Sequence, residues 1–439
     1  MEDIDINEIL DTPNEAVQLL KSRHSRQDFK KFLEEYDPDK HLIHDTAERP
    51  NKLITTQSGV RERKVSRLSL PFQRIIVDRA AAFLIGEGIQ MDAAPDGDPQ
   101  ARMVEMLGEV WHDNKLNYRT RQMVRTWMSE TEVAEYWYFH GDPVRMRMQI
   151  WAHSMGDMLC PYFDEYGDME AFGRGYKIGD TEYMDVWTDD YYVSYVKYTN
   201  WELDKKEPNK LGKIPVVFYQ RERPEWADVQ SLVERYETMI SNFADANDYF
   251  ASPMVKIKGQ VKGFADKGEQ GKMITLEENA DASYLTWDQA PAAIELEKET
   301  LQELIFTMTQ TPDISFKQMK GLGNISGVAL RMMFMDAKLK ALKHQEEFGE
   351  GLQRRLNLMK RGMTMLHTDV EDLRVTPEFV FYMPQNDQEL IGILTTAVGG
   401  KPIMSVETAV ANNPYVTDVE KEIENIEGDN AGNFGDIIP

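Results

Sequence analysis

Gly321, Gly323 and Gly327 stand directly before a long helical pattern and could bind a ligand. A glycine-rich loop before a helix can hold a phosphate, because its backbone N–H groups point at the anion. The spacing G-x-G-x-x-x-G differs by one residue from the dinucleotide fingerprint, and the helix start lacks the lysine of a Walker loop. We therefore expect the glycines to let the chain turn sharply, with Asn324 or Ser326 capping the helix.

The other residues that could do chemistry are few and scattered. His41 and His44 lie three positions apart, but a metal site needs three or four ligands, and no third ligand lies nearby in the sequence. We expect a pair of surface histidines. Cys160 is the only cysteine, so no intrachain disulfide can form, and burial is its expected state. Because no hydrolase, zinc-protease or kinase signature is present, the sequence predicts no catalytic residue, no metal site and no cofactor.

The net charge of the 439 residues is −25, which is the wrong sign for tight binding to a DNA duplex. It suits a soluble protein, or a surface that must not hold on to DNA. No apolar run approaches the roughly 20 residues that cross a bilayer. The N-terminus is acidic, unlike a secretory leader. We expect no contact with a membrane, and a reducing cytoplasm or a particle assembled in one.

Helical and β-rich segments alternate along the chain. Apolar residues at helical spacing predict helices within 14–36 and over about 100–114. Between them another helix is predicted, with Ile76, Ala80, Phe83 and Leu84 on one face and with Gly86 and Gly88 at its end. From Thr131 to Gln220, aromatic and β-branched segments separated by Gly, Asp and Pro predict a predominantly antiparallel sheet.

After Pro224 the sequence predicts two helices on either side of a small β-like insert. The second helix carries an apolar stripe of Leu301, Leu304, Ile305 and Met308. The insert is locally basic, and its lysines include Lys256, Lys258, Lys262 and Lys267.

A long helix is predicted from Gly327 to about Leu366, with Gly349 and Gly351 as possible kink points. Its apolar residues recur at four-three-four-three spacing and form one seam, made of Val328, Met332, Met335, Leu339 and Leu342. A strand, a short helix "DQELIGILTTAV" and an acidic helical tail follow.

Three stretches, in this order, carry a resemblance to a known family. They are "KVSRLSLPFQRIIVDRAAAFLIGEGI", the two helices around the insert, and "TPDISFKQMKGLGNISGVALRMMFMDAKLKA". The chain resembles the portal proteins of tailed bacteriophages, especially siphophage portals of the Gram-positive type. The third stretch matches a segment found at the tunnel loop of such portals, at Pro312, Asp313, Asn324, Ser326, Gly327, Ala329 and Leu330.

The resemblance implies an α+β portal-type fold in a ring oligomer, usually of twelve subunits, at one capsid vertex. It implies a mixed α/β wing, a two-helix stem, a small clip, a long kinked wing helix and a short helical crown. The corresponding ranges are 1–223 for the wing, 224–250 and 291–311 for the stem, 251–290 for the clip, 312–326 for the tunnel loop, 327–400 for the long helix and the C-terminal part of the wing, and 401–439 for the crown.

The resemblance also implies a non-enzymatic role in genome packaging and ejection. Double-stranded DNA would pass beside the tunnel-loop residues Ser315, Phe316, Lys317, Gln318, Lys320 and Asn324. A hinge between loop and helix would consist of Gly321, Gly323, Ser326 and Gly327. A protein partner or DNA would contact the clip lysines Lys256, Lys258, Lys262 and Lys267.

The implied partners are terminase, a head-completion or adaptor protein, the major capsid protein and a scaffolding protein. The implied location is the virion, after assembly in the host cytoplasm. Two alternatives stay open from the residues alone. One is a cytoplasmic enzyme with a phosphate-binding loop at Gly321–Gly327. The other is an acidic adaptor that binds only proteins.

Overall fold

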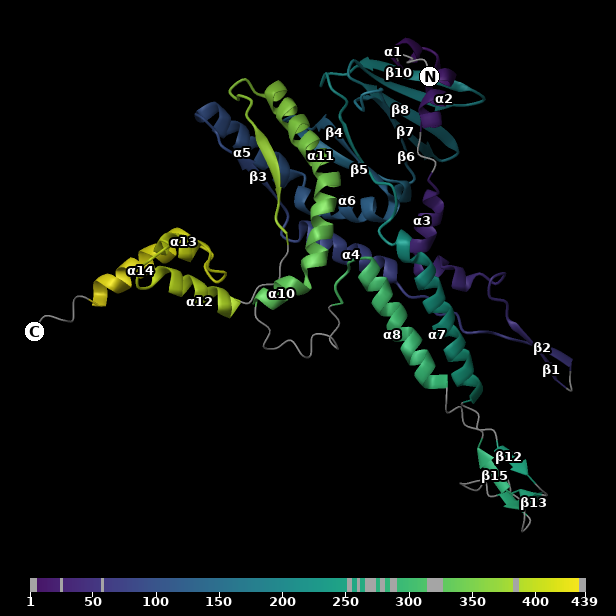
Figure 1. The fold of residues 1–439 in the computed structure, drawn as a ribbon. Helices are drawn as coiled ribbons and strands as arrows, with labels where there is room; N and C mark the ends of the chain where they lie inside the picture. The colour runs from purple at the N-terminus through teal and green to yellow at the C-terminus, as the bar shows by residue number, and fades with distance from the viewer. Residues whose placement is uncertain are drawn as a thin grey trace, which may run out of the picture.

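The chain folds into an α/β body from which several arms project (Figure 1). This computed structural model describes residues 6–23, 27–56, 59–250, 255–258, 261–264, 274–276, 281–284, 290–313, 327–381 and 387–433. Helices and strands both contribute, as the α+β prediction requires. Within these residues no helix is both long enough and apolar enough to cross a membrane.

Short helices and one hairpin make up the N-terminal part. Their bounds are α1 (Ile6–Ile9), α2 (Pro13–Arg23), α3 (Phe29–Tyr36), the 3-10 turns η1 (Pro38–Lys40) and η2 (Leu42–His44), and the strands β1 (Lys52–Thr56) and β2 (Gly59–Arg63). Helix α2 buries Val17 and Leu20 against one face of a sheet, where Cys160 also lies fully buried. Burial of the single cysteine was predicted and is confirmed, and it raises the pKa of the thiol to about 12.

The β-rich segment is antiparallel, as predicted, but it divides into two sheets. The three-stranded sheet has the order β11-β4-β5, with β4 (Glu132–His140), β5 (Arg145–Trp151) and β11 (Val216–Gln220). The five-stranded sheet has the order β10-β9-β8-β7-β6, with β6 (Met158–Phe163), β7 (Met169–Ile178), β8 (Thr181–Thr188), β9 (Tyr191–Lys197) and β10 (Trp201–Pro208). Trp151, Phe172 and Trp187 form a shared apolar cluster with Ile214, so aromatic packing holds this region together.

The main core lies between the three-stranded sheet and the helices around it. These are α4 (Phe72–Ile85), α5 (Asp98–Asp113) and α6 (Leu116–Glu130). Between α4 and α5 lies the strand β3 (Ile89–Ala93), which pairs with β16 (Val375–Phe379). The predicted apolar face of α4 is confirmed, since Ile76, Ala80, Phe83 and Leu84 are all buried.

Helices α7 (Gln230–Phe250) and α8 (Ala290–Met308) pack together and extend away from the body (Figure 1). At their far end β12 (Val255–Lys258) pairs with β15 (Asp281–Tyr284), and β13 (Val261–Phe264) pairs with β14 (Ile274–Leu276). On α8, Leu301 and Ile305 are buried as the predicted stripe requires, but Met308 is 59% exposed. The buried face turns toward Phe306 instead, which packs edge-on against Phe72 of α4.

The long helix reaches Leu366 as predicted, but it is interrupted at Phe334, between α10 (Gly327–Met333) and α11 (Met335–Leu366). The predicted seam is therefore not continuous. Gly349 and Gly351, the predicted kink points, lie inside the continuous helix α11. A Cβ at Gly351 would overlap the ring of Tyr219, so this glycine allows β11 to approach α11 closely.

The face of α11 that enters the core is not the predicted seam. Phe334, Ala337 and Ala341 pack against Phe83 of α4, because two alanines let the helices come close. The large apolar side chains of the seam stay outside: Met332, Met335, Leu339 and Leu342 are 67%, 50%, 53% and 39% exposed.

Three helices complete the chain on the opposite side of the body from β1 and β2 (Figure 1). They are α12 (Asp387–Val398), α13 (Val406–Ala411) and α14 (Val419–Asn433). The predicted short helix and acidic helical tail are thereby confirmed as helices.

Candidate functional site

Most of the residues predicted for the tunnel loop, its hinge and the insert lie outside the described part of the chain. These are Ser315, Phe316, Lys317, Gln318, Lys320, Gly321, Gly323, Asn324, Ser326 and the insert residue Lys267. Gly327 is the first residue of α10, Lys256 and the exposed Lys258 lie on β12, and Lys262 lies on β13. The structure therefore describes the two ends of segment 314–326 and the groups that anchor them.

The first anchor is the end of α8. Gln310 takes a left-handed backbone conformation with φ 50°, and the N–H of Thr311 donates to the carbonyl of Phe306 at 2.8 Å. This reversal is a common way to satisfy the last carbonyls of a helix. Arg79 of α4 then donates to the carbonyl of Pro312 at 2.6 Å, and its guanidinium lies 5.0 Å from the Phe306 ring centroid. The chain is thus fixed to α4 just before segment 314–326 begins.

The second anchor is a buried charge cluster around Glu225. Lys340 of α11 forms an ion pair with Glu225, and Arg221 lies 2.6 Å from the same carboxylate. His344 contacts it at 3.1 Å, while Lys340 also donates to the carbonyl of Thr309 at 2.6 Å. Burial by itself would raise the pKa of Glu225, but Lys340, His344 and Arg221 hold the pKa well below its ordinary value.

This cluster joins three elements that lie far apart in the sequence. Glu225 lies shortly before α7, Thr309 immediately follows α8, and Lys340 belongs to α11. The Lys340 ammonium also sits at the C-terminal end of α8, where a positive charge is favoured by the helix dipole. The cluster therefore ties α8, which precedes segment 314–326, to α11, which follows α10.

A second buried ion pair fixes the other half of α11. Arg355 has no exposed surface, and its guanidinium donates to Glu135 of β4 at 2.8–3.0 Å. Thr120 accepts from Arg355 at 2.7 Å, and the hydroxyl of Tyr219 donates to Glu135 at 3.2 Å. All four groups are buried, so α11 is tied to α6, β4 and β11 through one polar network.

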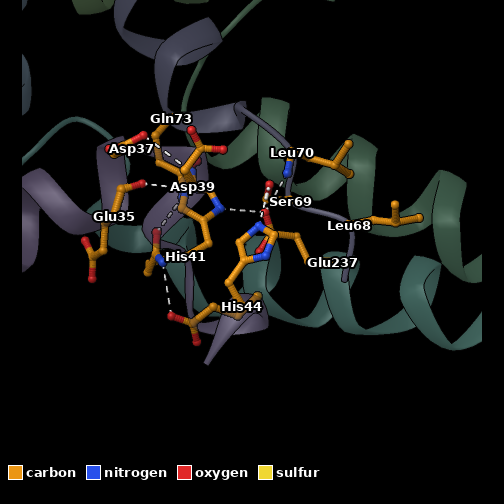
Figure 2. A network of polar contacts seen from close by, with 12 residues as sticks. Glu35, Asp37, Asp39, His41, His44, Leu68, Ser69, Leu70, Gln73 and Glu237 are labelled. Atoms are coloured by element: carbon orange, nitrogen blue, oxygen red, sulfur yellow. Dashed lines mark hydrogen bonds and ion pairs between the residues drawn. The ribbon is translucent and has the colours of Figure 1, made fainter. Parts of the chain in front are cut away.

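A third network attaches the N-terminal part to α7, and it corrects the prediction for His41 (Figure 2). His41 is only 5% exposed, with Nδ1 2.7 Å from Glu237 of α7 and Nε2 2.8 Å from the carbonyl of Glu35. Glu237 also accepts from the N–H of Leu70 at 2.7 Å. His44 contacts Ser69 at 3.0 Å. His41 is buried and His44 is partly buried, so the prediction of a pair of surface histidines is wrong.

The sequence analysis missed the Glu225 cluster. A signal was present, because Lys340 and His344 lie on the same helical stripe as Ala337, Ala341 and Phe348. Charged residues on a stripe of small and apolar residues indicate buried partners. Across the described residues, no group of three or more His, Cys, Asp or Glu side chains could hold a metal ion.

Comparison with known proteins adds similarities along most of the chain. The portal protein of Bacillus phage SPP1 is 22% identical, over 82% of this chain and 76% of that protein. Two solved structures show 11% identity over 77% of this chain. One is the neck of an empty gene transfer agent particle (88% of that chain, TM-score 0.45), and the other is the virion of a native gene transfer agent particle (87%, TM-score 0.42).

The family described as "Phage portal protein, SPP1 Gp6-like" matches residues 21–433. The chain belongs to this family. It is a portal protein of the phage virion, and it forms the channel at a capsid vertex. Portal proteins are a structural class, and none of these similarities supports the alternative of an enzyme with a phosphate-binding loop. The match spans α7, α8 and the two anchors of segment 314–326.

Proposed function

We propose that this portal protein assembles into a closed ring, usually of twelve subunits, through which double-stranded DNA passes during packaging and ejection. The observation that carries the proposal is the family match over 21–433, which includes the whole of segment 312–326. The ring also needs a head-to-tail contact between identical subunits. The large apolar side chains exposed on α10 and α11 supply a surface for such a contact.

In this proposal each region of the chain corresponds to one part of a portal subunit. Residues 1–223 and 327–400 are the wing, and helices α7 and α8 are the stem. The insert 251–290 is the clip, segment 312–326 is the tunnel loop, and 401–439 is a short crown. The two anchors described above support the assignment of the loop, because a segment that meets moving DNA needs rigid ends.

The charge of the chain agrees with a conduit that DNA slides through. Each phosphate that a protein neutralises adds about 0.9 to the salt dependence of binding, and a ring repeats every lysine in each subunit. A strongly basic wall would therefore hold the DNA in place. A chain of net charge −25 with lysines at a few narrow points makes weak contacts at many sites. Lys317 and Lys320 are the proposed contacts in the loop.

The insert lysines Lys256, Lys258, Lys262 and Lys267 are proposed to contact a protein partner or DNA at the end of the stem. The partners of the ring would be terminase during packaging, then a head-completion or adaptor protein, with the major capsid protein and a scaffolding protein around it. ATP hydrolysis would belong to terminase, since this chain has no Walker motif. The competing idea is an acidic adaptor that binds only proteins.

Reversing the charge of the loop tests the proposed DNA contact. In phage carrying Lys317→Glu and Lys320→Glu we expect several-fold fewer DNA-filled particles, because like charges would repel the phosphates. The measurement is the ratio of filled to empty particles, by sedimentation. The matched control is Lys210→Glu with Lys213→Glu, two exposed lysines at the same spacing in the loop between β10 and β11. An unchanged ratio in the loop variant would favour the protein-only adaptor.

A further inference from the structure

The hairpin formed by β1 and β2 extends away from the body of the molecule (Figure 1). Its strands pair only with each other among the strands that the structure describes, from Lys52↔Arg63 to Thr56↔Gly59. An isolated two-stranded hairpin is marginally stable in water. Leu53 is 74% exposed, Ile54 40% and Val60 64%. Such an arm is expected to gain stability by covering its apolar side chains against another surface.

The two faces of this hairpin differ in chemistry. Cross-strand partners share a face, so the pairs Leu53↔Glu62 and Thr55↔Val60 give a mainly apolar face. The pairs Lys52↔Arg63 and Ile54↔Arg61 give a basic face. A local excess of positive charge is unusual in a chain of net charge −25. The hairpin therefore fits a surface that is both apolar and acidic.

The base of the hairpin is held firmly, which fixes the direction of the arm. Asp245 of α7 accepts from the N–H of Ser66 at 2.7 Å and forms an ion pair with Arg49 at 3.1 Å. Lys52, at the start of β1, also contacts Asp245 at 3.6 Å. Since both ends of the hairpin are tied to one residue of α7, the arm is presented away from the body rather than folded back onto it.

A surface with matching chemistry lies elsewhere on the same subunit. A groove of about 580 Å³ lies between the end of α8 and the start of α11. Its charged lining is mainly acidic and consists of Glu299, Glu303, Asp313 and Asp336, with one lysine, Lys298. Next to it runs the exposed apolar stripe of Met332, Met335, Leu339 and Leu342.

The positions of the two surfaces suit a head-to-tail contact. In Figure 1, α10, α8, α7 and the β1–β2 hairpin follow one another across the molecule, with the hairpin at one edge and α10 near the middle. A heterologous interface needs two different patches on one subunit, and a ring closes when each subunit uses both. Opposite charges on the patches would also set the register and direction of assembly.

We propose that the β1–β2 hairpin of one subunit docks on the next copy of this chain. Its basic face, with Arg61 and Arg63, meets the acidic groove at Glu303 and Asp336. Its apolar face, with Leu53 and Val60, covers the stripe at Met335 and Leu339. This inference rests on the proposed ring, and it adds which two surfaces close that ring.

Charge reversal in separate chains tests the contact. The hairpin variant is Arg61→Glu with Arg63→Glu, and the groove variant is Glu303→Arg with Asp336→Arg. Each variant alone then presents two surfaces of like charge, so the ring fraction is expected to fall to below about a tenth of the wild-type value. An equimolar mixture restores rings of alternating subunits, because each reversed hairpin meets a reversed groove. Light scattering after size-exclusion chromatography and negative-stain images measure both results.

A cysteine pair tests the apolar half of the contact. With Val60→Cys and Leu339→Cys in one chain, oxidation is expected to give a ladder of disulfide-linked oligomers. The native Cys160 is fully buried and gives little background. The matched control is Tyr166→Cys with Leu339→Cys, since Tyr166 is 83% exposed on a loop of the five-stranded sheet. The control should give no ladder.

The outcomes separate this inference from the ring itself. If wild-type rings form, but the variants form rings equally well and the cysteine pair gives no ladder, the hairpin contact is wrong and the ring stands. If each charge variant fails and their mixture also fails, with unchanged thermal unfolding, the pairing of hairpin with groove is wrong. If the wild-type protein forms no ring under any condition, both the proposed function and this contact are wrong.

Discussion

Replacing Arg355 by methionine is expected to lower the free energy of unfolding of the subunit by about 3–5 kcal/mol. Methionine fills a similar volume but leaves the buried carboxylate of Glu135 without its cation. Thr120 also loses the group that donates to it at 2.7 Å. Denaturant unfolding followed by tryptophan fluorescence measures the loss. An exposed arginine serves as the control: Arg102→Met, which breaks only a surface pair with Glu105, should change the value by no more than about 0.5 kcal/mol.

A double variant shows whether the loss comes from the ion pair. Removing both charges, with Arg355→Met and Glu135→Leu, should cost less than the sum of the two single variants, because no buried charge is left alone. The coupling is expected to lie within about 0.5–3 kcal/mol. Strictly additive effects would mean that the two side chains do not interact as Arg355 and Glu135 do in this structure.

Replacing Glu225 by glutamine is expected to cost a similar amount, about 3–5 kcal/mol at neutral pH. Glutamine keeps the shape but removes the charge that compensates Lys340 and Arg221, both of which lie almost wholly inside the protein. The variant should loosen the joint between α7, α8 and α11, so hydrogen exchange should rise at the end of α8. The control is Glu222→Gln, three residues earlier, whose carboxylate is 87% exposed.

The cost of the Glu225→Gln change should depend on pH in one direction. The pKa of Glu225 is lowered in the folded protein, so its ionised form stabilises the fold above the ordinary glutamate value of about 4.3. That contribution is lost as the pH falls below 4.3 through the lower pKa of the folded state. The difference in unfolding free energy between wild type and variant should therefore be constant near pH 7 and shrink in acid. A difference that grows in acid would contradict the assigned charges.

Much of the fold could be predicted, because local patterns specify it. The helix at Asp387–Val398 has the predicted bounds, and the helix ending at Leu366 ends where the apolar pattern ends. The helix–insert–helix unit also appears in the order that the sequence predicts. In each case the spacing of the apolar residues and the nearby Pro or Gly residues are signals within the segment, so no distant contact is needed to predict the element.

Features that depend on contacts between distant segments could not be predicted in the same way. At the interruption, Phe334 packs against Phe83, some 250 residues earlier in the chain. The seam of Met335 and Leu339 is apolar by pattern, yet α4 already packs against the alanine face, so the seam stays exposed. His41 is a buried partner of Glu237 because the segments around His41 and Leu70 both contact α7.

In the candidate site, too, the contacts between distant segments could not be predicted. The sequence predicts lysines and glycines within 314–326, which lie outside the described residues and remain predictions. It does not predict the anchors, since Arg79, Glu225 and Lys340 come from three separate regions of the chain. The structure adds the contacts that hold the chain before the segment, at Pro312, and after it, at Lys340.

Electron microscopy of the purified full-length protein tests the central claim most directly. We expect closed rings with a central channel wider than a B-form DNA duplex, present over a range of salt concentrations. Fields that contain only monomers or dimers under all of these conditions would contradict the account of this chain as the conduit at the portal vertex.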